Sequence, residues 1–268
     1  MSNPSDGILH PSTPDFDGER YKDASRHQKE WGRKLIDELT LHGRETVIDL
    51  GCGDGVLTKL IAERVSEGTV LGVDSSPSMI AAAKKLEGGN LRFEILDIND
   101  LAFEGEFDVA FSNAALHWVK DHDRLLDRVL RSLRTGGRVR FNFAGDGNCS
   151  NFFAVARGVM GLPRYRKYFE QVQWPWFMPT QKEYETLVRR KDFSEHRTWA
   201  ENADRYFSED ELVKWIDQPS LVPLLALVHE DDKQGMRDLV VEMMKARTQT
   251  SDGRYFETFR RMNLYAIK

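Results

Sequence analysis

The chain has 268 residues, of which 40% are hydrophobic and 30% are charged, so it is long enough for one large domain or for a domain with a sizeable insertion. This composition excludes collagen-like, coiled-coil, disordered and small disulfide-stapled proteins. The 38 Lys and Arg against 43 Asp and Glu give a formal net charge of −5, which provides no basic surface for a polyanion and disfavours a primary nucleic-acid binder.

Neither a targeting segment nor a membrane span is expected. Residues 1–6 lack the basic and apolar regions of a signal peptide, and the longest aliphatic run, residues 221–228, is far shorter than the ~20 residues that cross a bilayer. Cys52 and Cys149 show no CxxC spacing and no nearby His, so we expect no metal site and a reducing compartment. The sequence therefore predicts a cytoplasmic protein.

The first half of the chain predicts a mobile leader followed by a ligand-binding core. Residues 1–18 hold three prolines and little apolar periodicity, which is typical of a mobile leader. Trp31, Leu35 and Leu39 recur at helical spacing, which predicts an amphipathic helix over residues 22–41. We expect the core to span residues 19–145 and this helix to act as a lid at its N-terminal end.

Within that core, short β-branched runs alternate with helical patterns. Strands are expected at residues 46–50, 69–73, 91–95, 107–111 and 138–143, and helices at 57–65, 78–86 and 125–133, the last stopped by Gly136-Gly137. This alternation predicts a parallel sheet with helices on both faces. Such a sheet binds ligands at the carboxyl ends of its strands.

The second half of the chain changes character. Residues 146–192 are rich in aromatic and basic side chains, which we interpret as an inserted lid of helices and loops over the substrate. Residues 193–268 return to the core sheet, with strands expected at 193–207 and 255–267 and helices at 208–216 and 233–248. The turn before the last strand suggests an antiparallel pair that closes the edge of the sheet.

The sharpest local feature is the loop Asp49-Leu50-Gly51-Cys52-Gly53-Asp54-Gly55 after the first strand. Its glycines permit a tight turn and a close approach of the backbone to a ligand. A dinucleotide fingerprint needs a third glycine where this chain has Val56, which disfavours a hydride-transfer dehydrogenase, and the Walker Gly-Lys-Ser/Thr is absent. Because two acids flank the loop, its ligand is more plausibly cationic, and S-adenosylmethionine, with an ammonium and a sulfonium, meets that requirement.

Two further acids follow the next strands. Asp74, at the end of the second strand, is suited to accept hydrogen bonds from ribose hydroxyls. Asp97, after the third strand, is suited to accept from an adenine amine. A single strand-end Asp is often only a cap or a turn residue, but the three acids at successive strand ends predict one shared binding site.

At these residues the chain resembles the class I S-adenosylmethionine-dependent methyltransferases, whose pattern is an acid, one spacer and Gly-x-Gly-x-Gly. The match continues through residues 73–80, 107–119 and 133–137. Within that class the chain is most similar to the trans-aconitate methyltransferase group, and residues 21–31 are similar to the juvenile-hormone-acid and malonyl-carrier O-methyltransferases. The resemblance implies a Rossmann-like, mostly parallel seven-stranded sheet with helices on both faces and a helical lid insertion.

The resemblance also implies a set of site residues. Around the cofactor they are Tyr21, Gln28, Asp49, Gly51, Cys52, Gly53, Asp74, Ser75, Met79, Asp97, Ile98, Asn113 and Ala114. The glycine loop would hold the methionyl part, Asp74 the ribose, Met79 the adenine face, and Asp97 with Ile98 the adenine edge. S-adenosylhomocysteine would be the product.

Three residues are candidates for contact with the acceptor: His117, Trp118 and Gln28. His117 either orients the acceptor and takes its proton or is merely a partly buried, hydrogen-bonded side chain, and Trp118 either lines the site or packs in the core. Gln28 and Tyr21 either reach over the ligands or face solvent. A carboxylate clamp is expected from one or two of Arg157, Arg164, Arg166, Lys167, Arg189 and Arg190.

Both neighbouring groups methylate carboxylates, and a carboxylate is ionised at pH 7 and needs no general base. We therefore predict O-methylation of a small organic acid. The alternatives are transfer to a hydroxyl, amine or carbon with His117 as base, or a non-catalytic protein that binds S-adenosylmethionine. Methylation of nucleic acid is disfavoured, since residues 112–115 are not the Asn/Asp-Pro-Pro-Tyr/Phe tetrapeptide. The acceptor's identity and the oligomeric state stay open.

Overall fold

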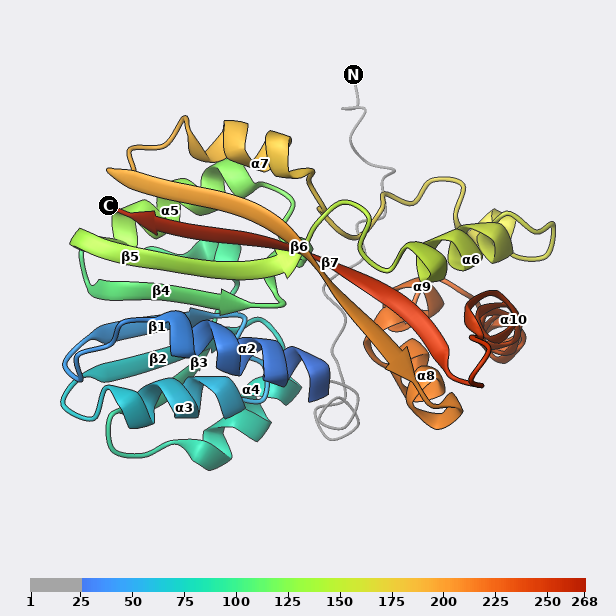
Figure 1. Ribbon diagram of the computed structural model, residues 1–268, viewed down its shortest axis with the longest axis horizontal. Coiled ribbons are helices and arrows are strands. Elements are labelled where there is room, and N and C mark those ends of the chain that lie inside the picture. Colours follow the sequence, from blue (N-terminus) through green and yellow to red (C-terminus); the bar gives the residue numbers. More distant parts are fainter. Residues whose placement is uncertain (1–25) are drawn as a thin grey trace, which may run out of the picture. The chain divides into compact units, whose positions relative to one another are not determined.

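The computed structural model describes residues 26–268, except for the side chains of residues 26–28 and 219. It contains one seven-stranded sheet in the order β3-β2-β1-β4-β5-β7-β6 (Figure 1). The strands are β1 (Thr46–Leu50), β2 (Thr69–Asp74), β3 (Leu91–Ile95), β4 (Phe107–Asn113), β5 (Leu133–Ala144), β6 (Glu195–Phe207) and β7 (Tyr255–Ile267). Neighbours from β3 to β5 pair in parallel, whereas β7 is antiparallel to β5. The expected Rossmann-like sheet is confirmed.

The described residues divide into two compact units. The first, called the sheet unit here, contains residues 26–146, 176–201 and 260–268, and the second, the helical unit, contains residues 147–175 and 202–259. This division differs from the expected boundaries at 146–192 and 193–268. The reason is a long-range contact that local patterns do not reveal, since α6 (Ser150–Met160) packs against α10 (Glu230–Thr248).

Helices of the sheet unit cover both faces of the sheet. They are α2 (Arg26–Glu38), α3 (Val56–Arg64), α4 (Pro77–Ala83), α5 (His122–Ser132) and α7 (Gln181–Val188), with short 3-10 turns at η1 (Lys84–Leu86), η2 (Ile98–Asp100) and η3 (Leu116–Trp118). The helical unit adds η4 (Arg166–Tyr168), α8 (Glu209–Trp215), the π-helical turn η5 (Ile216–Ser220) and α9 (Val222–Leu225). No helix among the described residues is long and apolar enough to cross a bilayer.

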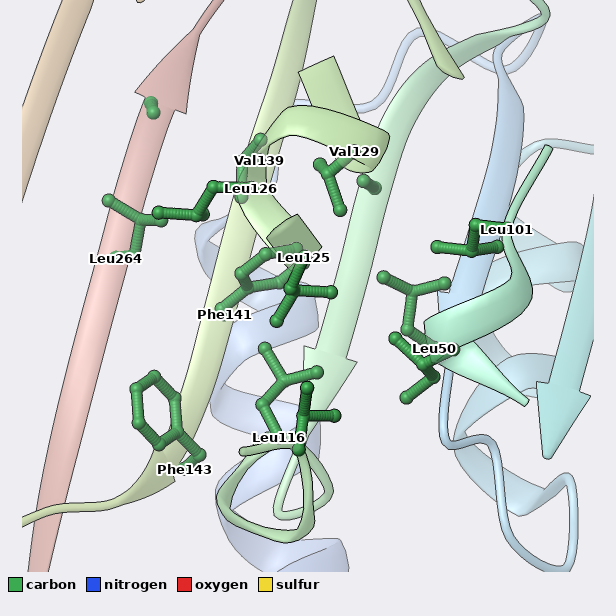
Figure 2. Close-up of a cluster of buried hydrophobic side chains, with 14 of the residues drawn as sticks. Leu50, Leu101, Leu116, Leu125, Leu126, Val129, Val139, Phe141, Phe143 and Leu264 are labelled. Atoms are coloured by element: carbon green, nitrogen blue, oxygen red, sulfur yellow. The ribbon is translucent and has the colours of Figure 1, made fainter. Parts of the chain in front are cut away.

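Two apolar clusters lie on opposite faces of the sheet. Along β1, Val47 belongs to the cluster with α2, α3 and α4, whereas the adjacent Ile48 belongs to the cluster with α5 and α7, as the alternation of side chains along a strand requires. Figure 2 shows the second cluster, in which Leu125 and Val129 of α5 approach Phe141 of β5. The parallel strands are buried on both faces because each face is covered by helices.

The Gly136-Gly137 pair does not simply end α5, as the sequence suggested. Helix α5 ends at Ser132, and β5 begins at once with Leu133. The pairing then jumps from Phe107–Leu133 to Val109–Arg138, so the residues between form a bulge in which Gly136 adopts a φ of 76°. Helix α2 ends at Glu38, three residues before the expected end, and residues 22–25 lie outside the described part.

Candidate cofactor and acceptor site

The glycine loop between β1 and α3 is fixed against the end of β2. The N–H groups of Gly51 and Cys52 donate to the Val73 carbonyl at 2.8 and 3.0 Å, and the Gly53 N–H donates to Asp74 Oδ2 at 3.0 Å. These bonds hold the glycine loop, which is expected to contact the methionyl part, beside Asp74, which is expected to contact the ribose. Both lie at the carboxyl ends of adjacent strands. This edge is also where the strand order reverses between β1 and β4, the usual ligand position in such sheets.

Two glycines of this loop serve different purposes. Gly51 and Gly53 both have positive φ, 72° and 54°, which side chains other than glycine rarely adopt. A Cβ at Gly51 would lie 2.2 Å from the Cβ of Ala115, whereas a Cβ at Gly53 would meet no atom within 4 Å. The loop therefore packs tightly on the start of η3 at Gly51 and faces open space at Gly53, which leaves room beside the backbone for a ligand.

Asp49 is a buried carboxyl at the end of β1. Its side chain is 2% exposed and accepts a hydrogen bond from the Thr58 hydroxyl at 2.7 Å. Burial raises the pKa of Asp49 to about 7, the Thr58 bond opposes this shift, and the charge of Asp74 adds to it. A cationic ligand group in this place would offset the repulsion between the two carboxylates.

Asp54 does not contribute to that cationic preference in the way the sequence suggested. Its carboxylate pairs with Lys29 of α2 at 2.7 Å, and the two side chains are only 13% and 15% exposed. The charge of Asp54 is thus balanced within the protein. The electrostatic argument for a cationic ligand rests on Asp49 and Asp74.

Asp74 and Asp97 both take part in turns. Asp74 Oδ1 accepts from the Ser76 N–H at 2.9 Å, and Asp97 Oδ1 accepts from the Asn99 N–H at 2.8 Å. Both are thus turn or cap residues, the alternative that the sequence left open. These bonds also hold each carboxylate in a fixed place at its strand end.

Several expected cofactor residues place their side chains in the interior. Met79 is 3%, Cys52 8% and Ile98 9% exposed, and burial raises the pKa of the Cys52 thiol. Cys52 offers the loop its backbone N–H, and its sulfur belongs to the apolar cluster under α3. Ser75 lies between Asp74 and the α4 cap at Ser76. Tyr21 and the side chain of Gln28 lie outside the described part of the chain.

The acceptor candidates follow β4. Asn113 ends the strand, and Ala114 adopts a φ of 59°, unusual for a residue with a Cβ. The Ala114 N–H donates to the Asn142 carbonyl at 2.7 Å, which holds this conformation. The turn η3 then presents His117 and Trp118, whose rings are 5.4 Å apart.

His117 is neutral at physiological pH. Burial, followed by the positive charge of Arg261 and the proximity of His122, lowers its pKa to about 3. Its Nδ1 atom is buried and has no hydrogen-bond partner among the described residues. The His117 carbonyl accepts from the Phe177 N–H at 2.8 Å, and Trp118 contacts Trp176 with ring centroids 5.5 Å apart, so residues 176–177 pack on η3.

A buried polar cluster beside His117 was missed by sequence reasoning. Arg261 of β7 is 4% exposed, donates from Nε and Nη2 to Asn142 Oδ1 at 2.8 and 2.6 Å, and lies over the ring of Trp31 in α2. The Asn142 amide donates in turn to Asn263 Oδ1 at 2.8 Å. The sequence pattern that could have revealed this cluster is the placement of polar residues between apolar ones in two strands, at 140–143 and 261–264.

The residues expected to supply a carboxylate clamp lie on the surface of the protein. Five of them are exposed and form ion pairs with acids: Arg164 and Lys167 with Asp232, Arg166 with Glu170, Arg189 with Glu185, and Arg190 with Asp123. Arg157 lies over the Trp174 ring. Exposed ion pairs of this kind contribute little to the stability of the folded protein. A carboxylate clamp formed by one or two of these residues stays a prediction.

Comparisons with known proteins find similarity to methyltransferases. Residues 47–137 match a family model described as a methyltransferase domain. The chain is 29% identical to an uncharacterized methyltransferase of Schizosaccharomyces pombe over 246 residues, 88% of this chain and 91% of that one. It is 52% identical to a trans-aconitate 2-methyltransferase of Deinococcus radiodurans over 91 residues, 34% of each chain.

The fold is also found among solved structures. Phosphoethanolamine N-methyltransferase 2 of Haemonchus contortus, in complex with S-adenosyl-L-methionine, superposes with a TM-score of 0.60 at 17% identity, over 95% of this chain and 57% of that one. The family match spans the segment from Asp49 to Trp118, but it excludes Gln28 and Arg261.

Proposed function

The chain is a class I S-adenosylmethionine-dependent methyltransferase similar to the trans-aconitate 2-methyltransferases, and we propose that it methylates a carboxylate oxygen of a small organic acid. The observation that carries this proposal is the neutral His117 next to the cationic Arg261. Their arrangement suits an acceptor that is already an anion.

S-adenosylmethionine is the methyl donor, and the residues at the strand ends fit it. The open space at Gly53 would admit the methionyl part, and Asp49 with Asp74 would face its ammonium and the ribose. When bound, the sulfonium supplies an electrophilic methyl group. Asp97 and Ile98 would take the adenine edge, while Asn113 and Ala114 would lie toward the acceptor.

His117 is poorly suited to act as a general base. An effective base has a pKa near the working pH, whereas the pKa of His117 is about 3. An unactivated hydroxyl or ammonium acceptor would need such a base. A carboxylate with an ordinary pKa near 4 needs none, and the positive charge of Arg261 would attract it.

What the chain then contributes is placement. The acid would be oriented toward the methyl group and stripped of water, two effects that together supply much of the rate enhancement in reactions of this type. The aromatic side chains of Trp118 and Trp176 would help exclude water.

The test is incubation of the purified protein with methyl-labelled S-adenosylmethionine and a panel of small acids, followed by mild alkali. Release of the label as methanol supports the proposal. Label that resists alkali would move the acceptor to a hydroxyl, amine or carbon. Saturable cofactor binding without any transfer would indicate a non-catalytic binding protein.

A further inference from the structure

Thr58 lies on the buried side of α3, in a stripe of otherwise apolar residues. Its side chain is fully buried, as are those of Ile61, Ala62 and Val65, which pack in the cluster under α3. Residues at this spacing share one face of a helix, so an aliphatic residue is expected at position 58. A hydroxyl that is removed from water needs a hydrogen-bond partner. The bond that Thr58 makes is therefore the feature to explain.

The hydroxyl of Thr58 bonds to a different element of the fold. A threonine inside a helix often donates to the carbonyl one turn earlier, as Thr248 does to Met244 at 2.8 Å in α10. Thr58 donates instead to Asp49 Oδ2, at the end of β1, at 2.7 Å. This bond holds one oxygen of the Asp49 carboxylate in a fixed place beside the glycine loop.

The same bond also influences whether Asp49 is charged. Burial raises the pKa of Asp49 to about 7, the bond from Thr58 lowers it, and the charge of Asp74 on β2 raises it. A hydroxyl that donates to a carboxylate favours the charged form of that carboxylate. Thr58 therefore opposes the protonation that burial and Asp74 promote.

Two further titratable groups of the glycine loop lie near Asp49. The Cys52 thiol is buried, and burial followed by the charges of Asp49 and Asp74 raises its pKa, so it stays neutral. Asp54 is paired with Lys29 of α2. A cationic ligand group at this edge of the sheet would therefore meet a carboxylate whose position and charge depend on the bond from α3.

We propose that Thr58 is a positioning residue for the cofactor: by donating to Asp49 it presents that carboxylate, in its charged form, to the ammonium of the methionyl part. This inference rests on the cofactor arrangement in the proposed function, in which Asp49 faces that ammonium. It does not depend on the acceptor. It gives a role in cofactor affinity to a residue whose place in the helix pattern is that of a core residue.

The experiment measures ligand binding without an acceptor, by isothermal titration of the whole chain at pH 6, 7 and 8.5. S-adenosylhomocysteine carries the ammonium, whereas 5′-methylthioadenosine carries the same nucleoside and lacks the ammonium. Thr58→Val removes the hydroxyl and keeps the shape of the side chain, and Thr58→Ser keeps the hydroxyl. The matched control is Thr248→Val, which removes a buried hydroxyl that donates within its own helix.

In the wild type, S-adenosylhomocysteine should bind about tenfold more weakly at pH 6 than at pH 8.5, because Asp49 must lose a proton before it can pair with the ammonium. Thr58→Val should weaken this binding by a further factor of about ten at pH 6 and by less than about twofold at pH 8.5, since losing a hydrogen bond to a charged group raises the pKa of Asp49 by about one unit.

The remaining titrations separate this effect from a loss of structure. Thr58→Ser should stay within about threefold of the wild type, and Thr248→Val within about twofold, at every pH. The affinity for 5′-methylthioadenosine should change by less than about twofold with pH and with Thr58→Val. If Thr58→Val does not fold, Thr58→Ala removes the same hydroxyl and makes the same test.

Equal weakening of both ligands by Thr58→Val would overturn the inference, because the hydroxyl would then act through the structure of the loop as a whole. Wild-type affinity for S-adenosylhomocysteine that does not change with pH would overturn it as well. If Thr58→Val weakens S-adenosylhomocysteine selectively but the wild type forms no ester, the inference stands and the proposed function is refuted. Ester formation by the wild type, with unaltered S-adenosylhomocysteine binding by Thr58→Val, would do the reverse.

Discussion

Lys29 of α2 and Asp54 of the glycine loop form an ion pair of 2.7 Å whose two side chains are almost buried. The pair joins the first described helix directly to the loop that is proposed to hold the cofactor. Close packing accompanies it, since a Cβ at Gly32 would lie 2.1 Å from Leu57 and 3.1 Å from Asn113. The docking of α2 and the shape of the cofactor site are therefore linked.

Replacing Lys29 by Met should lower the free energy of unfolding by about 1 kcal/mol, more than an exposed pair would, because it leaves the Asp54 carboxylate without this partner in a largely buried place. Amide hydrogen exchange in α2 should become faster than in α5. The matched control is Arg44→Met, which breaks the exposed pair with Glu67 and should change neither quantity measurably. Unaltered exchange in α2 of the Lys29 variant would argue against the link.

Asp49 should make the protein less stable as the pH rises. Its folded-state pKa of about 7 lies above the unfolded value near 3.9, so the folded state keeps a proton that the unfolded state has lost. Stability should fall between about pH 4 and pH 7 and level off above. Urea denaturation gives the free energy of unfolding at each pH. In the Asp49→Asn variant, the loss of this free energy between pH 5 and pH 8 should be smaller than in the wild type by roughly 2 to 3 kcal/mol. If the free energy of unfolding changed with pH in the same way in both proteins, the raised pKa of Asp49 would be refuted.

His117 should leave no mark on the pH profile of the reaction. Since its pKa is about 3, the imidazole stays neutral from pH 5.5 to pH 8. At saturating cofactor and acid, kcat should be level over that range in the wild type and in His117→Gln. A fall in kcat below pH 6 that disappears in the variant would restore the role of general base.

Glu257 stabilises the helical unit from within β7. Its buried carboxylate accepts from the N–H groups of Phe152 at 2.8 Å and Asn151 at 3.3 Å, at the start of α6, where a negative charge is favourable. Glu257→Ala should lower the free energy of unfolding by about 2 to 4 kcal/mol. Glu230→Ala, at an exposed pair with Lys233, should cost less than about 1 kcal/mol. Equal losses would contradict the capping role.

The parts of the fold that depend on local patterns were predictable. The strand at residues 255–267 appears with the expected bounds, since alternation along a strand is a local signal. The helix expected at 208–216 begins after Ser208, whose side chain forms a capping box with Glu211. The glycine loop was found for the same reason, because positive φ at Gly51 and Gly53 restricts the residue type directly.

The contacts that give the site its charge were not predictable, because they join distant residues. Asn142 and Arg261 are 119 positions apart, and each reads alone as an exposed polar residue. Asp54 was counted as an uncompensated acid because its partner, Lys29, lies on a helix 25 residues earlier. Only the folded chain shows that the charge of Asp54 is balanced by Lys29 and that the charge of Arg261 is buried beside His117.

The most direct test of the account is the fate of the methyl group. Labelled S-adenosylmethionine, the purified protein and a small-molecule extract are incubated together, and the products are treated with mild alkali. The account predicts that the label is released as methanol from a methyl ester. Label that remains bound to the product through alkali would contradict it.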